Sequence, residues 1–246
     1  MNIAKVKAGK FLKVIFALGA FLMAMPVALP AQFKFITNNG AITITGYAGE
    51  GGAVTIPSTL DGYPVMGIAE DAFYECSSVT SLTVSDSVTC IGDDAFMDCS
   101  GLTNVVIGSG VASIGNDTFG NCMELVNVSL PNSLTNIGDG AFAMCGSLTS
   151  VVIPDRVSSI GEMAFAGCDC LRSVARPESL TSVGDSLFDG CLSLTSVAIP
   201  NRCGQHRPDG IRELFWPDEC GHSRQRDQGG RRRVLGLQRI DERDDW

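Results

Sequence analysis

Apolar residues recur with a period of 23 positions through the middle of the chain. Three successive units read IGDDAFMDCSGLTNVVIGSGVAS (residues 91–113), IGNDTFGNCMELVNVSLPNSLTN and IGDGAFAMCGSLTSVVIPDRVSS. One cysteine stands at the same place in each unit: Cys76, Cys99, Cys122, Cys145, Cys168 and Cys191. A repeat of this length is typical of a solenoid, because a single unit cannot bury its apolar face and stacked units can.

Each unit is predicted to form one coil with two short walls. Val105 and Ile107 lie two positions apart in a strand-like run, so both face the interior of the coil. A turn rich in glycine follows, and Val111 and Ile114 then point inward from the opposite wall. The segment DDAF predicts a short helical or 3₁₀ corner whose Phe96 fills the end of the coil. The expected fold class is a β-rich solenoid of parallel strands with short helical corners.

The outward positions of the first wall form a candidate binding surface, which we call the strand wall. Its side chains are small and mostly hydroxylated, with no aromatic residue among them. Aromatic residues and arginine are typical of binding hot spots, so a ligand here would be recognised over a broad area. The alternative is that serine and threonine merely suit a flat β-surface. The candidate residues are Ser81, Thr83, Asn104, Val106, Asn127, Ser129, Ser150, Val152, Ser173 and Ser196.

Residues 32–67 are predicted to form a β cap on the first coil, and residues 68–201 about six coils. The segment FKFITNNGAITITGYAGEGGAVTIP alternates apolar and polar residues around Asn39-Gly40. This dipeptide is a strong signal for a two-residue hairpin turn. A hairpin with further strands would cover the open end of the stack, which solenoids require.

Residues 1–31 have the pattern of an export signal. Four lysines precede an apolar run at residues 14–29, and small residues follow it, so cleavage is expected after Ala31. An uncleaved anchor is the alternative, but the run is short for a membrane span and contains Pro26. We therefore expect a secreted or cell-surface protein that is not inserted in a membrane after cleavage.

The charge distribution argues against nucleic acid and anionic membranes as partners. Between residues 32 and 201 there are 18 Asp and Glu against four Lys and Arg, a net charge of −14. Such a body lacks the basic patch that phosphate recognition requires.

Catalytic and metal-binding patterns are also missing from residues 32–201. The segment has no histidine and no nucleophile-elbow, phosphate-loop or zinc-protease motif, so we expect neither an enzyme nor a cofactor. Cys168 and Cys170 lack a second ligand pair for zinc. Asp93, Asp94 and Asp98 do not have the spacing of a calcium loop and are better explained as a solvated corner.

The repeat resembles the BspA-type subfamily of bacterial leucine-rich repeats. The resemblance rests on I-G-x-x-A-F-x-x-C with L-x-x-V-x-I, and on the lead-in ITITGYAGEGGAVTIPSTLDGYPV; it covers about residues 33–201. It implies a right-handed leucine-rich-repeat solenoid on secreted or surface-exposed proteins, several of which are adhesins or matrix binders. It implies no catalytic residues. Thr118 and Leu187 depart from the usual alanine, and Arg176 stands where isoleucine belongs.

The six repeated cysteines are expected to remain thiols. Equivalent positions of neighbouring coils point the same way, so the cysteines stack in a column and do not face one another. Buried free cysteine behaves as a small apolar residue. Disulfide bridging is the alternative that an exported chain with 10 cysteines would otherwise favour.

The tail at residues 202–246 has a different composition, with both histidines, both tryptophans and ten arginines. A basic extension, a zinc module and an out-of-frame translation could each explain it. In a shifted frame, Trp216-Pro217 forces a glycine in register with Gly101, and Leu214-Phe215 permits a cysteine 23 positions after Cys191. The frameshift explains the tail best, because two whole units can be spelled in phase with the repeat.

The frameshift interpretation carries three structural expectations. The tail would be largely disordered, because it has no periodic apolar pattern. At least two coils and a C-terminal cap would be lost. The last coil would expose its apolar edge at Leu194, Val197 and Ile199, which favours edge-to-edge self-association.

Two functions of different class remain. The first is an exported leucine-rich-repeat interaction module for surface adhesion, with a protein or glycan ligand at the strand wall. The second is a structural spacer or scaffold of a larger surface protein, truncated by the frameshift. A decayed fragment without function is a further alternative.

Overall fold

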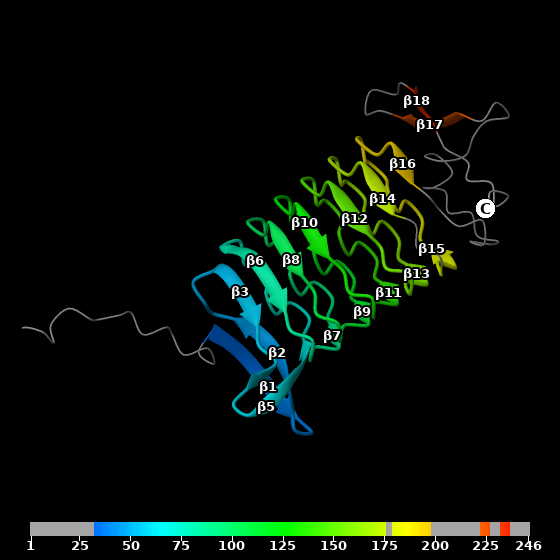
Figure 1. Cartoon of the computed structure of the whole chain (residues 1–246). Helices are drawn as coiled ribbons and strands as arrows, with labels where there is room; N and C mark the ends of the chain where they lie inside the picture. The colour runs from blue at the N-terminus through cyan, green and yellow to red at the C-terminus, as the bar shows by residue number, and fades with distance from the viewer. Residues whose placement is uncertain (1–31, 176–178, 198–221, 227–231, 237–246) are drawn as a thin grey trace, which may run out of the picture.

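The computed structural model describes residues 32–175, 179–197, 222–226 and 232–236. Short parallel strands stack coil upon coil into a β-solenoid with two walls (Figure 1). The predicted fold class is confirmed. The export signal and Arg176 lie outside the described residues.

The N-terminal cap begins with the predicted hairpin. Strands β1 (Phe33–Asn38) and β2 (Ala41–Tyr47) pair in antiparallel register. The turn residues Asn39 and Gly40 have φ angles of 50° and 76°, as a type I′ turn requires. Three further strands complete the cap: β3 (Gly52–Ile56), β4 (Thr59–Leu60) and β5 (Tyr63–Ile68).

Both walls of the solenoid start from this cap. Strand β3 pairs in parallel with β6, and β2 pairs in parallel with β5. The strand wall consists of β6 (Val79–Val84), β8 (Asn104–Val106), β10 (Asn127–Ser129), β12 (Ser150–Val152), β14 (Ser173–Ala175) and β16 (Ser196–Val197). We call the opposite side the back wall; after β5 it contains β7 (Cys90–Ile91), β9 (Ser113–Ile114), β11 (Asn136–Ile137), β13 (Ser159–Ile160) and β15 (Ser182–Val183).

The corners differ from the prediction, because the described ones contain turns and no helical segment. Backbone groups in each corner bond to the next coil; Phe96 N, for example, donates to Thr118 O over 2.8 Å. Two positions per corner have left-handed φ angles, which interrupt any helix. The first position holds Asp71, Asp94, Asp117, Gly140, Met163 and Ser186, and the second Glu75, Asp98, Asn121, Met144, Gly167 and Gly190.

The core consists of columns of identical residues along the solenoid axis. The rings of Phe73, Phe96, Phe119, Phe142, Phe165 and Phe188 stack with centroid separations between 4.7 and 5.8 Å. Tyr47 of the cap continues this column and stacks on Phe73 at 5.0 Å. Thr118 is fully buried, and its hydroxyl donates to Gly92 O over 3.0 Å, so the departure from alanine is accommodated.

One residue of the last described coil is less exposed than the sequence suggested. Leu194 is only 1% exposed, so the expected exposure at this residue is wrong. Leu194 continues the interior column of Leu148 and Leu171, which are both fully buried. The side chains of Val197 and Ile199 lie outside the described residues.

Within residues 202–246, the structure describes strands β17 (His222–Arg226) and β18 (Arg232–Gly236), which pair in antiparallel register. The expectation of a largely disordered tail otherwise falls outside the described residues. Across the part of the chain that is described, no helix has the length and apolar character needed to cross a membrane.

Candidate functional site

The strand wall brings the predicted site residues together in two rows. Parallel pairing places Ser81 beside Asn104 and Asn104 beside Asn127. Further along, Ser150 lies beside Ser173, and Ser173 beside Ser196. The second row contains Thr83, Val106 and Ser129, then Val152 and Ala175. Neighbouring members of a row are separated by about 4.8 Å, the spacing of paired strands.

The side chains of these rows are accessible where the structure describes them. Ser81 and Asn104 are half-buried, and the others from Thr83 to Ser173 are exposed. Val106 and Val152 are 40% and 69% exposed, although both are large apolar residues. The side chain of Ser196 lies outside the described residues.

Other polar side chains of the solenoid are occupied by bonds between coils. The hydroxyls of Thr89, Thr135 and Thr181 donate to backbone carbonyls of the preceding coil over 2.9–3.0 Å. Thr103 and Thr195, which precede strand-wall strands, do the same over 2.9 and 3.1 Å.

The corners contain a second bonded column. Asp93 accepts a bond from Asn116 N over 2.7 Å, and Asn116 accepts one from Asp139 N over 2.9 Å. Asp139 in turn accepts a bond from Glu162 N over 2.8 Å. These carboxylates and amides therefore join coils.

The outward polar side chains of the strand wall do not take part in such hydrogen bonds between coils. Among the described residues, the hydroxyls and amides from Ser81 to Ser173 in the two rows make no side-chain hydrogen bond within the protein. Their donors and acceptors are not used to join coils and are therefore available to a ligand. This distinction could not be predicted, because Ser and Thr occur on both walls.

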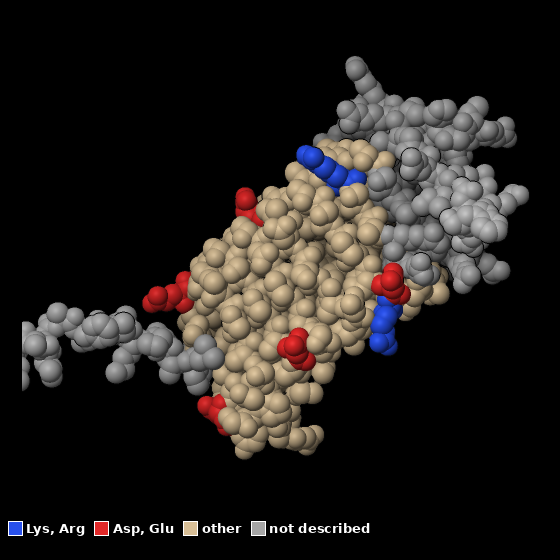
Figure 2. Space-filling model, viewed as in Figure 1, with Lys and Arg blue, Asp and Glu red and all other residues tan. Residues whose placement is uncertain are grey.

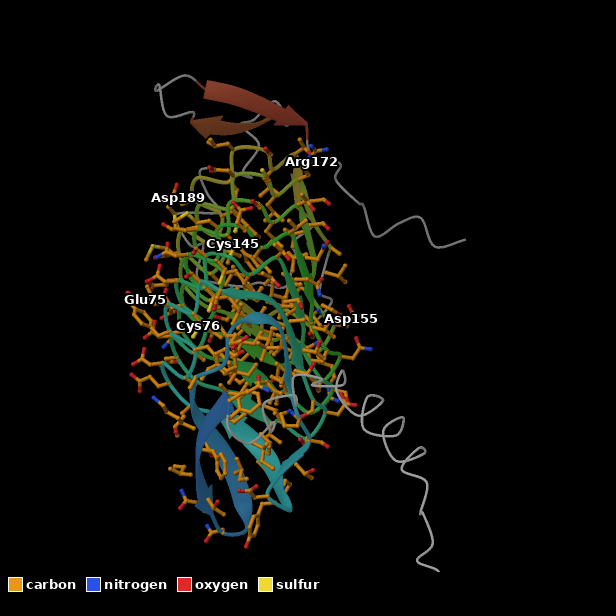
Figure 3. The ribbon with its side chains drawn as sticks, turned by 90° about the vertical axis from the view of Figure 1, so that its left-hand side faces the viewer. Glu75, Cys76, Cys145, Asp155, Arg172 and Asp189 are labelled. Atoms are coloured by element: carbon orange, nitrogen blue, oxygen red, sulfur yellow. The ribbon has the colours of Figure 1, made fainter. Side chains whose placement is uncertain are left out.

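Charge is segregated away from the strand wall. The corners carry Glu70, Asp71, Glu75, Asp93, Asp94, Asp98, Asp117, Asp139, Glu162, Asp185 and Asp189. Figure 3 shows Glu75 and Asp189 on the corner side of the coils, with Asp155 and Arg172 on the other side. The side of the solenoid seen in Figure 2 is formed mostly by uncharged side chains, with a few scattered charges.

Burial, together with crowding, raises the pKa of two corner acids. Burial, followed by repulsion from Asp117 and Asp71, raises the pKa of Asp94. Burial and the charge of Asp139 raise the pKa of Asp117 in the same way. Nevertheless, within the described residues no three His, Cys, Asp or Glu side chains are grouped so that they could hold a metal ion.

The repeated cysteines form the predicted column of buried thiols from Cys99 to Cys191, whereas Cys76 is half-buried. Each buried sulfhydryl donates to a phenylalanine carbonyl of the preceding coil; for Cys122 and Phe96 the distance is 3.3 Å. Burial raises the pKa of the Cys99 and Cys145 thiols to about 12. These thiols are therefore neither bridged nor available as nucleophiles at neutral pH.

The strand wall is interrupted at one place, and the sequence did not predict this interruption. The strands from β3 to β10 form one sheet and those from β12 to β16 another, while the back wall continues through both. The residues around β10 follow the repeat template apart from Leu130 in the place of isoleucine, so the sequence pattern did not indicate the break. Val126 and Met123, on the coil of β10, are 37% and 57% exposed and were not predicted as surface residues.

Comparison with known proteins places these features in a bacterial context. The family described as BspA type leucine rich repeat region, with six copies, matches residues 135–208. Among curated proteins, none matches the sequence significantly.

Several solved structures are similar to the chain. A leucine-rich repeat protein of T. pallidum is 30% identical; the match covers 67% of this chain and 88% of that one, with a TM-score of 0.57. A leucine-rich repeat protein of Bacteroides ovatus is 33% identical, with 67% and 44% covered and a TM-score of 0.61. A leucine-rich cell surface protein of Faecalibacterium prausnitzii is 27% identical, with 83% and 59% covered and a TM-score of 0.53. The match therefore spans less than two thirds of the last two proteins.

Proposed function

Because this chain belongs to the BspA-type leucine-rich repeat family, we propose that it is an exported interaction module whose strand wall binds a partner at the cell surface. Similarity to a leucine-rich cell surface protein supports the location, as does the export pattern at residues 1–31. The partner is a protein or a glycan of the extracellular matrix, and the activity is adhesion.

One observation carries this proposal: the strand wall exposes polar side chains, among a few apolar ones, that make no hydrogen bond within the described structure. Comparable groups before the strands and in the corners are used to join coils. A surface of about 4.8 Å periodicity with free donors and acceptors can meet an extended ligand at many equivalent points. Affinity would then arise from the summed area and not from one hot spot.

The test is binding of the full chain to a panel of immobilised matrix proteins and glycans. The informative pair of variants is Ser173→Lys and Ser182→Lys, because both serines are exposed on the same coil but lie on opposite walls. We expect Ser173→Lys to weaken binding by about tenfold and Ser182→Lys to leave it unchanged.

Two outcomes would count against the strand wall. Equal loss in both variants would indicate a nonspecific charge effect or another binding face. Binding to no member of the panel would favour the alternative function, a structural spacer within a larger surface protein.

A further inference from the structure

Three methionines are exposed together on one corner of the solenoid. Met123, Met144 and Met163 are 57%, 55% and 51% exposed and belong to three successive coils. Hydrogen bonds join the last two, because Met144 N donates to Ala166 O over 2.7 Å and Ala166 N donates to Met163 O over 2.9 Å. We call the outward surface of residues 121–123, 140–146 and 163–167 the methionine corner.

Each of these methionines neighbours a glycine of an adjacent coil. Gly146, Gly167 and Gly140 hold the repeat positions of Met123, Met144 and Met163, respectively. The sulfur of Met144 occupies the space that a β-carbon at Gly167 would need, and the space at Gly146 is open. Flexible thioether side chains beside glycine can adapt to apolar partners of different shape.

Backbone strain accompanies the exposure of two of these side chains. Met144 and Met163 have φ angles of 59° and 52°, a left-handed conformation that is costly for methionine. Asparagine holds the position of Met144 in the preceding coil, at Asn121, with a φ angle of 57°. Strained backbone positions are concentrated at functional sites, so this strain supports a role in binding.

The methionine corner is uncharged but has an acidic border. Residues 140–146 and 163–168 contain no charged side chain. The exposed carboxylates of Asp139 and Glu162 directly precede these two segments, and that of Asp169 follows the second. Further exposed carboxylates stand on the flanking coils, at Glu124, Asp185 and Asp189.

This combination of apolar and acidic groups selects a cationic, amphipathic ligand. In the described repeats the basic residues are Arg156 and Arg172, and Figure 3 shows Arg172 on the opposite side of the coils from Asp189. An anionic ligand would be repelled by the border, whereas lysine or arginine would be attracted to it. An exposed apolar patch with a polar border is typical of an interaction site.

The size of the acidic border suits a polypeptide helix. The coils from that of Glu124 to that of Asp189 are separated by three intervals of about 4.8 Å, or about 14 Å in all. Nearly three turns of an α-helix cover this length, at about 5.4 Å per turn. A helix with one apolar face can place that face on the methionines and direct flanking basic residues to the carboxylates.

We propose that the methionine corner is a second binding site of this chain, for a basic amphipathic helix of a polypeptide partner. Apolar side chains of the helix contact Met123, Met144 and Met163, and its lysine or arginine side chains pair with the acidic border. This site is independent of the strand wall, so its failure would leave the proposed function of the wall untouched.

The probe is an acetylated and amidated peptide of leucine and lysine, about 14 residues long, with the leucines at helical spacing. It is titrated into the full chain with isotopically labelled methionine methyl groups. We expect shift changes at the methyl groups of Met123, Met144 and Met163. Met66 is the internal reference, because it is 37% exposed but lies on strand β5 of the cap.

The double variant Met144→Asn, Met163→Asn should weaken peptide binding by at least about tenfold, because it removes two apolar contacts. Asparagine tolerates the left-handed conformation, so the variant should fold, which circular dichroism checks. Ile36→Asn is the control, since Ile36 is 50% exposed on the cap, and it should bind the peptide like the parent. Equal losses in the control, or equal shifts at Met66, would overturn the methionine corner as the site.

A pair of charge variants tests the acidic border. Glu162→Gln should weaken binding by about threefold, and added salt should reduce this difference. Asp155→Asn removes the same charge from an exposed residue that Figure 3 shows on the other side of the coils, and it should have no effect. Equal effects of the two variants would mean that net charge alone attracts the peptide and would overturn the border as its binding partner.

Two further probes test the chemical class of the ligand. Spermine carries positive charge without an apolar face, so equal methyl shifts with spermine would overturn the polypeptide assignment. A peptide with glutamine in place of every lysine keeps the leucines, and we expect it to bind much more weakly. Equal binding of that peptide would refute the requirement for a basic partner.

Discussion

Two residues in every described corner have a left-handed backbone, and most of them are residue types that tolerate it. Aspartate, asparagine and glycine hold most of these positions, but Met144 and Met163 have φ angles of 59° and 52°. For a side chain such as methionine this conformation costs roughly 1–2 kcal/mol. The repeat therefore stores strain at two coils where the sequence gives no compensating polar contact.

Met163→Asn is expected to stabilise the protein by about 0.5–1 kcal/mol, because asparagine tolerates the left-handed conformation and Met163 is 51% exposed. Urea denaturation followed by circular dichroism measures the change. Met123→Asn is the control, since Met123 is 57% exposed but is not among the residues with positive φ. A gain of the same size in the control would show that relief of backbone strain is not the cause.

Asp94→Asn is expected to stabilise the protein at pH 7. The pKa of Asp94 is raised above its usual 3.8, so the folded state holds this proton more tightly than the unfolded state. The contribution of Asp94 to folding stability therefore falls as the pH rises from about 3.8 through the raised pKa. Asparagine carries no charge, so the substitution removes this loss of stability. Melting temperatures of both proteins at pH 7 and pH 3 measure the effect, which should shrink at the lower pH.

Asp86→Asn is expected to change the stability of the same solenoid in the opposite direction at pH 7. A backbone hydrogen bond from Ser109 lowers the pKa of Asp86, so its stabilising effect is present above pH 3.8 and is lost as pH falls through the lowered pKa. This variant should melt lower than the parent at pH 7. Stabilisation by both substitutions at pH 7 would show that net charge, and not the local environment, controls the response.

The thiols are expected to differ sharply in their rate of alkylation, according to whether they are exposed or buried. With Cys203→Ser and Cys220→Ser as background, iodoacetamide at pH 8 should alkylate the exposed Cys90 and Cys170 in the native protein. Cys99 and Cys145 should react only after denaturation, because their pKa values of about 12 leave almost no thiolate. Peptide mass spectrometry identifies the labelled sites; native labelling of Cys145 would contradict the buried column.

At the scale of elements, the two walls and the columns of identical residues could be predicted from the sequence, but the conformation of the corners could not. The 23-residue spacing alone aligns the phenylalanines and cysteines, so the two walls and the thiol column could be inferred from residue identities. The corner DDAF suggested a helix because helix and turn share short-range spacing. In the structure, Asp94 and Asp98 have left-handed φ angles, and Asp94 N and Phe96 N bond to the next coil. Bonds between coils thus alternate with single-turn bonds, such as that from Met97 N to Asp94 O over 3.0 Å, and no continuous helix forms.

The candidate site was likewise predictable in position but not in detail. Outward positions of the strand wall follow from alternation, and nine of the ten predicted side chains can be placed and are partly or fully exposed. The interruption depends on how β10 and β12 sit relative to each other, which the repeat pattern does not specify. Val128 and Val151 are the same residue type at the same repeat position, yet only Val151 is fully buried.

Phe119→Ala is expected to destabilise the protein by about 3–5 kcal/mol, because Phe119 is fully buried between Phe96 and Phe142 in the ring column. Chemical denaturation measures the loss. Tyr74→Ala is the control, since Tyr74 is 42% exposed and should cost less than about 1 kcal/mol. Similar losses for both variants would mean that the ring column contributes little beyond local packing.

At the scale of the whole molecule, the coils form a one-dimensional array in which each coil contacts its neighbours. Stability in such an array is approximately the sum of coil terms and interface terms. The described cap closes one end by stacking Tyr47 on Phe73. What lies beyond residue 201 therefore matters for stability as well as for function.

The frameshift hypothesis makes a prediction at this scale. Codons 202–246 should spell two further repeat units in the shifted frame, with cysteines 23 and 46 positions after Cys191. A chain with the frame restored should add coils and interfaces to the array and so melt at a higher temperature than the present chain. Sequencing the coding DNA around codons 198–206 is the direct test, and codons that cannot encode the repeat in that frame would refute the hypothesis. A restored chain that melts no higher would instead show that the added units do not stack on the coil of Phe188 and Cys191.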